Sequence, residues 1–171
     1  MRQRVQFQVI CRQALPQCNM AEYDQLAAEA EAVGSEIFWL GGVNQAEVQR
    51  LEKLISLNLP TSFKRFLLEY GGGDVVGAEV SGIEDGDASI ESGGTVLGDT
   101  NQCRKLFGLP SDLVVIYFHD NEVCWCLDTA RLRDGECPVV SGSMPFPVEI
   151  DRSTNVTIGG SIPLLCSSTQ T

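Results

Sequence analysis

The spacing of apolar residues changes at Gly71-Gly72-Gly73, and this change constrains the fold more than any other feature of the sequence. Before these glycines, apolar side chains recur at the three- and four-residue spacing of amphipathic helices. After them, short runs and alternations typical of strands predominate. Helices followed by successive strands pack as helices on an antiparallel sheet. The sequence therefore predicts an α+β fold in which amphipathic helices pack on a mainly antiparallel β-sheet.

Three helices are predicted before the glycines. The first begins at Asn19, where Glu22 completes an Asn-x-x-Glu cap, and ends at Gly34. The second begins after Asn44, which forms the same pattern with Glu47. Its predicted buried stripe is Val48, Leu51, Leu54 and Ile55, with Arg50 and Lys53 facing water.

Pro60 separates the second helix from the third, because proline cannot continue a helix. The third helix runs to Tyr70. Its buried face is predicted to be Phe63, Phe66, Leu67 and Tyr70.

The strands are predicted after residue 74. Val75 to Ile83 is a candidate strand interrupted by Gly77, and Glu84 to Asp87 is a turn. A short helix is expected from Thr100, as its cap, to Phe107.

The strongest strand signal is residues 113–118, which are rich in β-branched and aromatic side chains. Residues 119–122 form a turn, and residues 123–127 return as the hairpin partner. After a second turn at Asp134-Gly135, residues 137–140 form another strand.

We expect one domain over residues 19–152, an N-terminal extension over 1–18, and a tail or final short strand over 153–171.

Charge narrows the classes of partner. The chain of 171 residues has 12 Lys plus Arg, 23 Asp plus Glu, and a formal net charge of -11. Binding along nucleic acid or an anionic membrane requires a basic face, so we expect neither partner.

The sequence has no apolar run of about 18 residues, and its arginine-interrupted N-terminus does not resemble a signal peptide. We therefore expect a cytoplasmic protein.

The sequence gives little support for a catalytic site or a metal site. His119 is the single histidine, and it lies in a predicted turn. Cys124 and Cys126 fall on one side of a strand, and with Cys137 and His119 they could form a zinc site. Their spacing differs from the usual Cys-x2–4-Cys pair, however, so reduced core thiols are the simpler interpretation. We expect no enzyme activity, no metal and no cofactor.

Negative charge is concentrated in one segment. No Lys or Arg occurs between Arg65 and Arg104, and eight carboxylates lie between them: Glu69, Asp74, Glu79, Glu84, Asp85, Asp87, Glu91 and Asp99. Such a segment is either a solvated acidic face or a surface for a basic protein partner, because complementary charge speeds association and selects partners.

Residues 41–73 carry an ordered set of motifs. These are Gly41-Gly42 before a hydrophobic residue, the Leu51-Glu52 pair, the Leu59-Pro60 break, and an aromatic helix ending at Gly71-Gly72-Gly73. Further similar segments are Gly108-Leu109-Pro110, residues 113–116, Cys126-Leu127-Asp128 and residues 135–139. Over residues 20–141 the chain resembles the SUKH superfamily, which includes bacterial immunity proteins and a yeast regulator of cell-wall synthesis.

This resemblance implies an α+β fold without catalysis. It also implies that Gly41, Gly42, Leu51, Glu52, Leu59, Pro60, Gly72 and Gly73 are structural. The chain departs from the family after residue 153, where members usually end in a helix.

The favoured hypothesis is an immunity protein that blocks a cognate basic toxin, such as a nuclease of a polymorphic or contact-dependent system. The alternative is a non-enzymatic interaction module in cell regulation. The residues expected to contact the partner are Glu84, Asp85, Asp87 and Glu91, with Asp120 and Glu122 as a second group.

Overall fold

The computed structural model describes residues 28–29, 32, 34, 37–75, 77–120, 122–143 and 149–157. The described helices are α2 (Gln45–Ile55), α3 (Thr61–Tyr70) and α4 (Val96–Phe107), with 3-10 turns η1 (Glu84–Gly86) and η2 (Thr129–Arg131). The strands are β1 (Ile37–Trp39), β2 (Gly73–Val75), β3 (Ala78–Val80), β4 (Leu113–His119), β5 (Val123–Asp128), β6 (Pro138–Ser143) and β7 (Glu149–Thr157). The predicted extension over 1–18 lies outside these residues, as does almost all of the helix predicted from Asn19 to Gly34.

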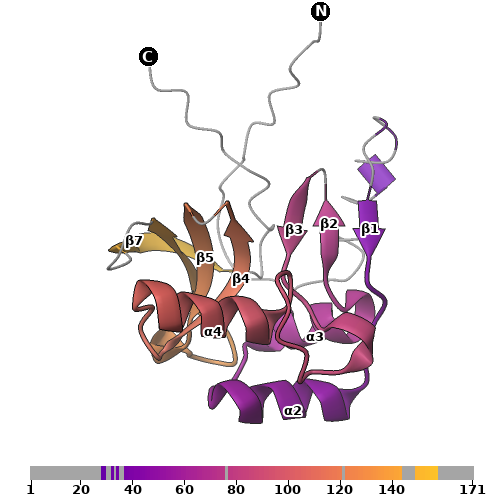
Figure 1. The fold of residues 1–171 in the computed structure, drawn as a ribbon, viewed down its shortest axis with the longest axis horizontal. Helices are drawn as coiled ribbons and strands as arrows, with labels where there is room; N and C mark the ends of the chain where they lie inside the picture. Colours follow the sequence, from indigo (N-terminus) through magenta and orange to yellow (C-terminus); the bar gives the residue numbers. More distant parts are fainter. Residues whose placement is uncertain are drawn as a thin grey trace, which may run out of the picture.

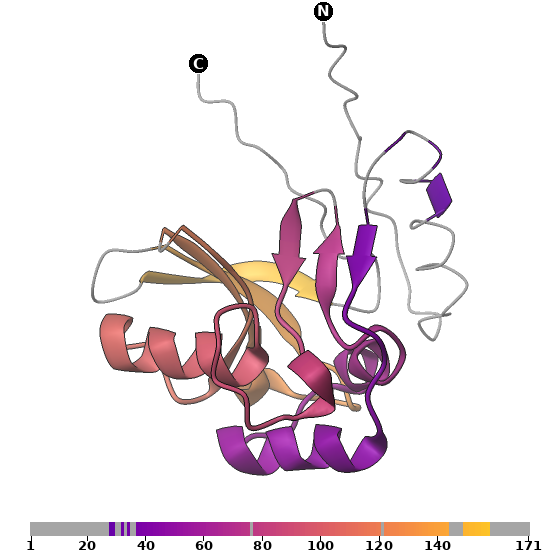
Figure 2. The same cartoon turned by 45° about the vertical axis from the view of Figure 1, so that its right-hand side comes forward.

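The strands form one antiparallel sheet in which spatial order follows chain order from β1 to β7. Figures 1 and 2 show α4 lying over β4 and β5, with α2 farthest from the strands. The α+β prediction is therefore confirmed. None of the helices in the described ranges has the length and apolar character needed to cross a membrane.

Helix α2 begins as predicted, because the side chain of Asn44 accepts hydrogen bonds from the backbone N–H groups of Ala46 and Glu47. Val48, Leu51 and Ile55 are buried. The prediction for Leu54 was wrong, since its side chain is 45% exposed. Position 54 lies at the margin of the stripe formed by the other three residues, which pack in one core cluster with residues of α3 and α4.

Helix α3 has the predicted buried face of Phe63, Phe66, Leu67 and Tyr70. Its first turn is stabilised from a distant part of the chain, because Pro60 has no side chain that could cap the helix. Glu136 instead accepts hydrogen bonds from the backbone N–H of Ser62 at 3.0 Å and from its hydroxyl at 2.5 Å. A carboxylate at a helix N-terminus also opposes the positive end of the helix dipole.

The predicted strand from Val75 to Ile83 is instead a hairpin of two short strands, β2 and β3. The chain reverses at Gly77, which has a φ of 81°. Its N–H donates to the side chain of Asp74 at 2.8 Å. A glycine inside a strand-like run therefore marks a turn in this chain.

Helix α4 begins earlier than predicted. Thr95 caps it by accepting a hydrogen bond from Gly98 N–H, and Thr100 lies inside the helix rather than at its start. The Thr100 hydroxyl accepts a hydrogen bond from the backbone N–H of Val115 at 3.0 Å. The hydroxyl takes the place of a strand partner there, because β3 pairs with β4 only at Val80 and Tyr117.

The predicted strand 113–118, the turn after it and the return strand 123–127 are confirmed as β4 and β5. The side chains of β4 alternate between two buried clusters. Val114 and Ile116 pack with α2 and α3, whereas Leu113 and Val115 pack with Cys103 of α4. The sheet is therefore covered on both faces at β4.

The sheet ends with β7, which pairs with β6 and crosses position 152, so the first residues of the segment predicted as a tail or a final short strand form a strand. Residues 153–157 are thus part of a strand. The terminal helix usual in the family does not occupy those five positions.

Three segments of backbone cross without room for side chains. A Cβ at Gly42 would collide with the carbonyl oxygen of Leu68, one at Gly73 with that of Phe38, and one at Gly72 would lie 2.5 Å from Cα of Gly82. Gly72 also has a φ of 134°, which side chains disfavour. The Gly-Gly motifs are therefore needed for the end of α3 to pass β1 and the segment after β3.

We predict that Gly72→Ala lowers the free energy of unfolding by at least about 2 kcal/mol, because it adds both a clash and backbone strain. Gly93→Ala is the matched control, since no heavy atom lies within 4 Å of its added Cβ. Urea denaturation measures both variants. Equal midpoints for the two would contradict the crossing as the reason for glycine at position 72.

Candidate functional site

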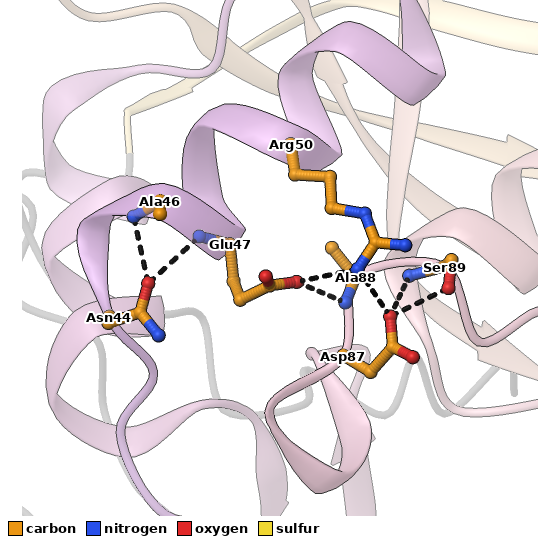
Figure 3. A network of polar contacts seen from close by, with 7 residues as sticks. All are labelled: Asn44, Ala46, Glu47, Arg50, Asp87, Ala88 and Ser89. Atoms are coloured by element: carbon orange, nitrogen blue, oxygen red, sulfur yellow. Dashed lines mark hydrogen bonds and ion pairs between the residues drawn. The ribbon is translucent and has the colours of Figure 1, made fainter.

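The four acidic residues predicted as the main contacts lie in or beside η1, in the loop that joins β3 to α4. The first turn of α2 holds this loop in place. Glu47 Oε2 accepts a hydrogen bond from the backbone N–H of Ala88 at 2.9 Å. Asn44 caps α2 at its start, and Glu47 and Arg50 point from successive turns of this helix toward the loop, as Figure 3 shows.

Asp87 is bound within the chain. Its Oδ1 is 2.8 Å from Arg50 Nη1 and also accepts hydrogen bonds from the N–H and hydroxyl of Ser89 at 2.9 and 2.6 Å (Figure 3). These bonds from Ser89, together with the Arg50 charge, lower the pKa of Asp87. Arg50 also lies 3.3 Å from Glu47, so it bridges the helix and the loop.

The other three residues of the loop differ in how free their carboxylates are. Glu84 is half-buried and accepts a hydrogen bond from the hydroxyl of Ser92 at 2.7 Å. Asp85 and Glu91 are exposed. The structure thus brings all four predicted residues into one loop and leaves Asp85 and Glu91 facing solvent.

Asp120 and Glu122 lie elsewhere. They flank the β4–β5 turn, and both are exposed. Asp120 Oδ2 is 3.1 Å from Nε2 of His119. Because β4 runs antiparallel to β3, this turn is at the opposite end of the strands from the loop after β3 (Figure 1). The two predicted groups therefore do not form one surface.

Asp99 is a buried carboxylate beneath the loop. Its side chain accepts a hydrogen bond from the Ser81 hydroxyl at 2.6 Å and one from Gly94 N–H at 3.3 Å. Burial raises the pKa of Asp99 above its usual value, and the neighbouring charge of Glu79 acts in the same direction. This group ties α4 to the end of β3.

The cysteines and histidine considered for zinc are separated. Cys103, Cys124 and Cys126 lie in the cluster beneath α4, with 3.7 Å between the sulfurs of Cys124 and Cys126. Cys137 packs in the other cluster, where burial raises its pKa to about 12, and His119 is exposed. In the described part of the chain, no group of three or more metal-ligating side chains could hold an ion.

A comparison with protein families identifies the chain. The model of the family SUKH_5, described as SMI1-KNR4 cell-wall, matches residues 23–143. The chain belongs to the SUKH_5 family. The matched region extends from the segment before β1 to the end of β6, and so includes the loop and both predicted acidic groups.

The motif residues of this SUKH domain have structural contacts. Glu52 Oε1 accepts a hydrogen bond from Leu59 N–H at 2.8 Å and lies 2.7 Å from Lys64 Nζ. It therefore joins α2 to the break before α3, where Leu59 and Pro60 are buried. Leu51 is 1% exposed in the core.

A second segment of the SUKH motifs stabilises the same helix. Gly135 accepts a hydrogen bond from Thr61 N–H through its carbonyl oxygen, and Glu136 caps α3. The sequence resemblance included both residues, but only the fold shows that they meet the start of α3.

Sequence reasoning missed one group of side chains, on the outer side of the SUKH domain at β1–β3. Phe38 of β1 pairs in register with Asp74 of β2, which pairs with Glu79 of β3. The signal was available in the strand alternation around Gly77, since Asp74 and Glu79 occupy matching positions of the hairpin.

We predict that Asp99 makes stability depend on pH. Its pKa is raised in the folded state, so the native state binds a proton more readily than the unfolded state. This favours the native state increasingly as pH falls through the folded pKa. As pH is lowered from 7 to ~4, the free energy of unfolding of the wild type should therefore rise relative to that of Asp99→Asn.

Urea titrations of both proteins at several pH values measure this difference. Asp134→Asn is the matched control, because Asp134 is an exposed carboxylate. A difference between wild type and Asp99→Asn that stays constant across the pH range would contradict the prediction.

Proposed function

We propose that this SUKH domain is an immunity protein, which binds a cognate bacterial toxin and blocks the toxin's active site. Family membership supports a role in immunity or regulation rather than catalysis. The observation that carries the proposal is a large excess of negative charge that the domain does not neutralise internally.

That excess is clearest in the segment between Arg65 and Arg104. Of its eight carboxylates, Asp87 is the only one with a Lys or Arg partner among the ion pairs of the described residues. Asp85 and Glu91 project from a loop that α2 holds in place, so their positions are set before a partner arrives. Preorganised charge of this kind speeds association and improves affinity.

A nuclease toxin is the class of partner that this charge suits best. A nuclease has a basic cleft, because it must hold phosphates. A domain with a net charge of -11 can compete for such a cleft and exclude the nucleic acid both sterically and by charge. Neutralisation then requires binding alone, with no bond made or broken.

A second role is favoured by the family description, which refers to the cell wall. In that role the same domain would be a non-enzymatic interaction module in cell regulation. The absence of a toxin gene beside its own gene would favour this alternative.

We predict that co-expression of the domain rescues cells from the toxin domain encoded by the adjacent gene. The measurement is growth after induction of the toxin with and without the SUKH domain. A toxin variant without its catalytic residues is the control, because its expression shows whether the toxin's catalytic activity is what kills the cells. Equal death with and without the SUKH domain would overturn the proposal for that partner.

We also predict that Glu91→Lys slows association with the toxin by about 3–10-fold at low salt, because it reverses an exposed charge on the loop. The effect should shrink as salt shortens the Debye length to a few Å. Glu122→Lys makes the same charge change at the opposite end of the strands. An equal effect of both variants in stopped-flow measurements would show that net charge acts without a preferred surface.

A further inference from the structure

The outer face of β1–β3 is open in the part of the chain that the structure describes. Helix α4 covers this side of the sheet over β4 and β5, where Thr100 meets Val115 and Cys103 packs with Cys126. The part of the sheet that α4 covers ends at Ser81, directly after β3, where the Ser81 hydroxyl donates a hydrogen bond to Asp99 of α4. The next outward position along β3 is Glu79, which is exposed.

Side chains on the opposite face of the same strands are fixed in the core. Trp39 of β1 packs on Tyr70 and Phe66 of α3, with ring centroids 4.6 and 6.1 Å away. Because side chains alternate along a strand, the neighbours of Trp39 must point outward. Phe38 is accordingly 63% exposed and Leu40 is 38% exposed.

The outward residues form a row across three strands: Phe38, Asp74 and Glu79 are consecutive cross-strand partners. Asp74 and Glu79 are opposite one another in register, but their carboxylates have different neighbours, and that of Glu79 lies beside Gly94. Asp74 accepts a hydrogen bond from Gly77 N–H. Among the described residues, no ion pair joins either carboxylate to a Lys or Arg.

This combination has the chemistry of a site for arginine. A guanidinium can stack on an aromatic ring while its N–H groups donate to carboxylates, and its positive charge offsets one of the two negative charges. Leu40 extends the apolar surface beside Phe38 and can pack against the arginine's aliphatic stem. A partner's arginine would therefore supply the cation that neither carboxylate has among the ion pairs of the described residues.

We propose that the outer face of β1–β3 is a docking surface on which Phe38, Asp74 and Glu79 bind an arginine of a basic protein partner. This inference rests on the proposed function, because the toxin is that partner. It places the main contacts on the sheet, beside the loop that carries Glu91. Gly94 lies directly under the Glu79 carboxylate, so the sheet face and the loop adjoin.

The first test measures binding of the full chain to the toxin encoded by the adjacent gene. Phe38→Ala should weaken affinity about tenfold or more, as expected for an aromatic hot spot. Asp74→Asn with Glu79→Gln should weaken it similarly, because both negative charges are removed, while leaving the urea midpoint of the free domain nearly unchanged. Leu106→Ala is the apolar control, since Leu106 is 54% exposed on α4, and Asp134→Asn is the charge control.

A decrease in affinity without a decrease in the urea midpoint would support the docking surface, because loss of a residue with only a structural role would lower the midpoint. Unchanged affinity in the Phe38 and Asp74/Glu79 variants, with cells still protected, would overturn this inference and leave the immunity role intact. Failure of the wild type to protect would overturn the immunity role instead.

The second test uses a known probe in place of the toxin. Titration with an oligo-arginine peptide and with an oligo-lysine peptide of equal length is followed by amide NMR shifts. We expect tighter binding of the arginine peptide, shifts centred on β1–β3, and loss of the arginine preference in Phe38→Ala. Shifts centred elsewhere, equal affinity for both peptides, or dimerisation of the free domain through this face would contradict the proposal.

Discussion

The close backbone crossing at the glycines is the constraint on which the rest of the structure depends. Gly42, Gly72, Gly73 and Gly82 let the end of α3, the end of β1 and the segment after β3 pass at distances that leave no space for a Cβ. This crossing sets the position of β1–β3 relative to α3. It also sets where the chain leaves β3, and so where the acidic loop begins.

The helical half and the main hairpin could be predicted from the sequence because their signals are local. Asn44 caps α2 through its nearest neighbours, and β4 and β5 have strong strand propensity joined by a short turn. The start of α4 could not be located this way. Its true cap, Thr95, precedes a glycine-containing turn, whereas Thr100 looked like a cap but has a tertiary partner in Val115.

The candidate site was predicted less completely than the fold, for the same reason. Counting charges located the acidic segment but could not separate carboxylates with internal partners from those without. Asp87 is bound by Arg50 and Ser89, which are 37 positions before it and 2 positions after it. The row formed by Phe38, Asp74 and Glu79 depends on strand register, which becomes known only when β1 is paired with β2.

The narrow junction between β3 and β4 has a consequence for evolution. The three-stranded end is joined to the four strands beyond it by one register pair, Val80 with Tyr117, and by a hydrogen bond from Ser81 N–H to the carbonyl oxygen of Ile116, and the Thr100 hydroxyl completes the junction from α4. Outward side chains on β1–β3 can therefore be exchanged without disturbing the two-sided core around β4. A lineage facing a changing opponent could revise its specificity on that end of the sheet while inheriting the remainder of the domain unaltered.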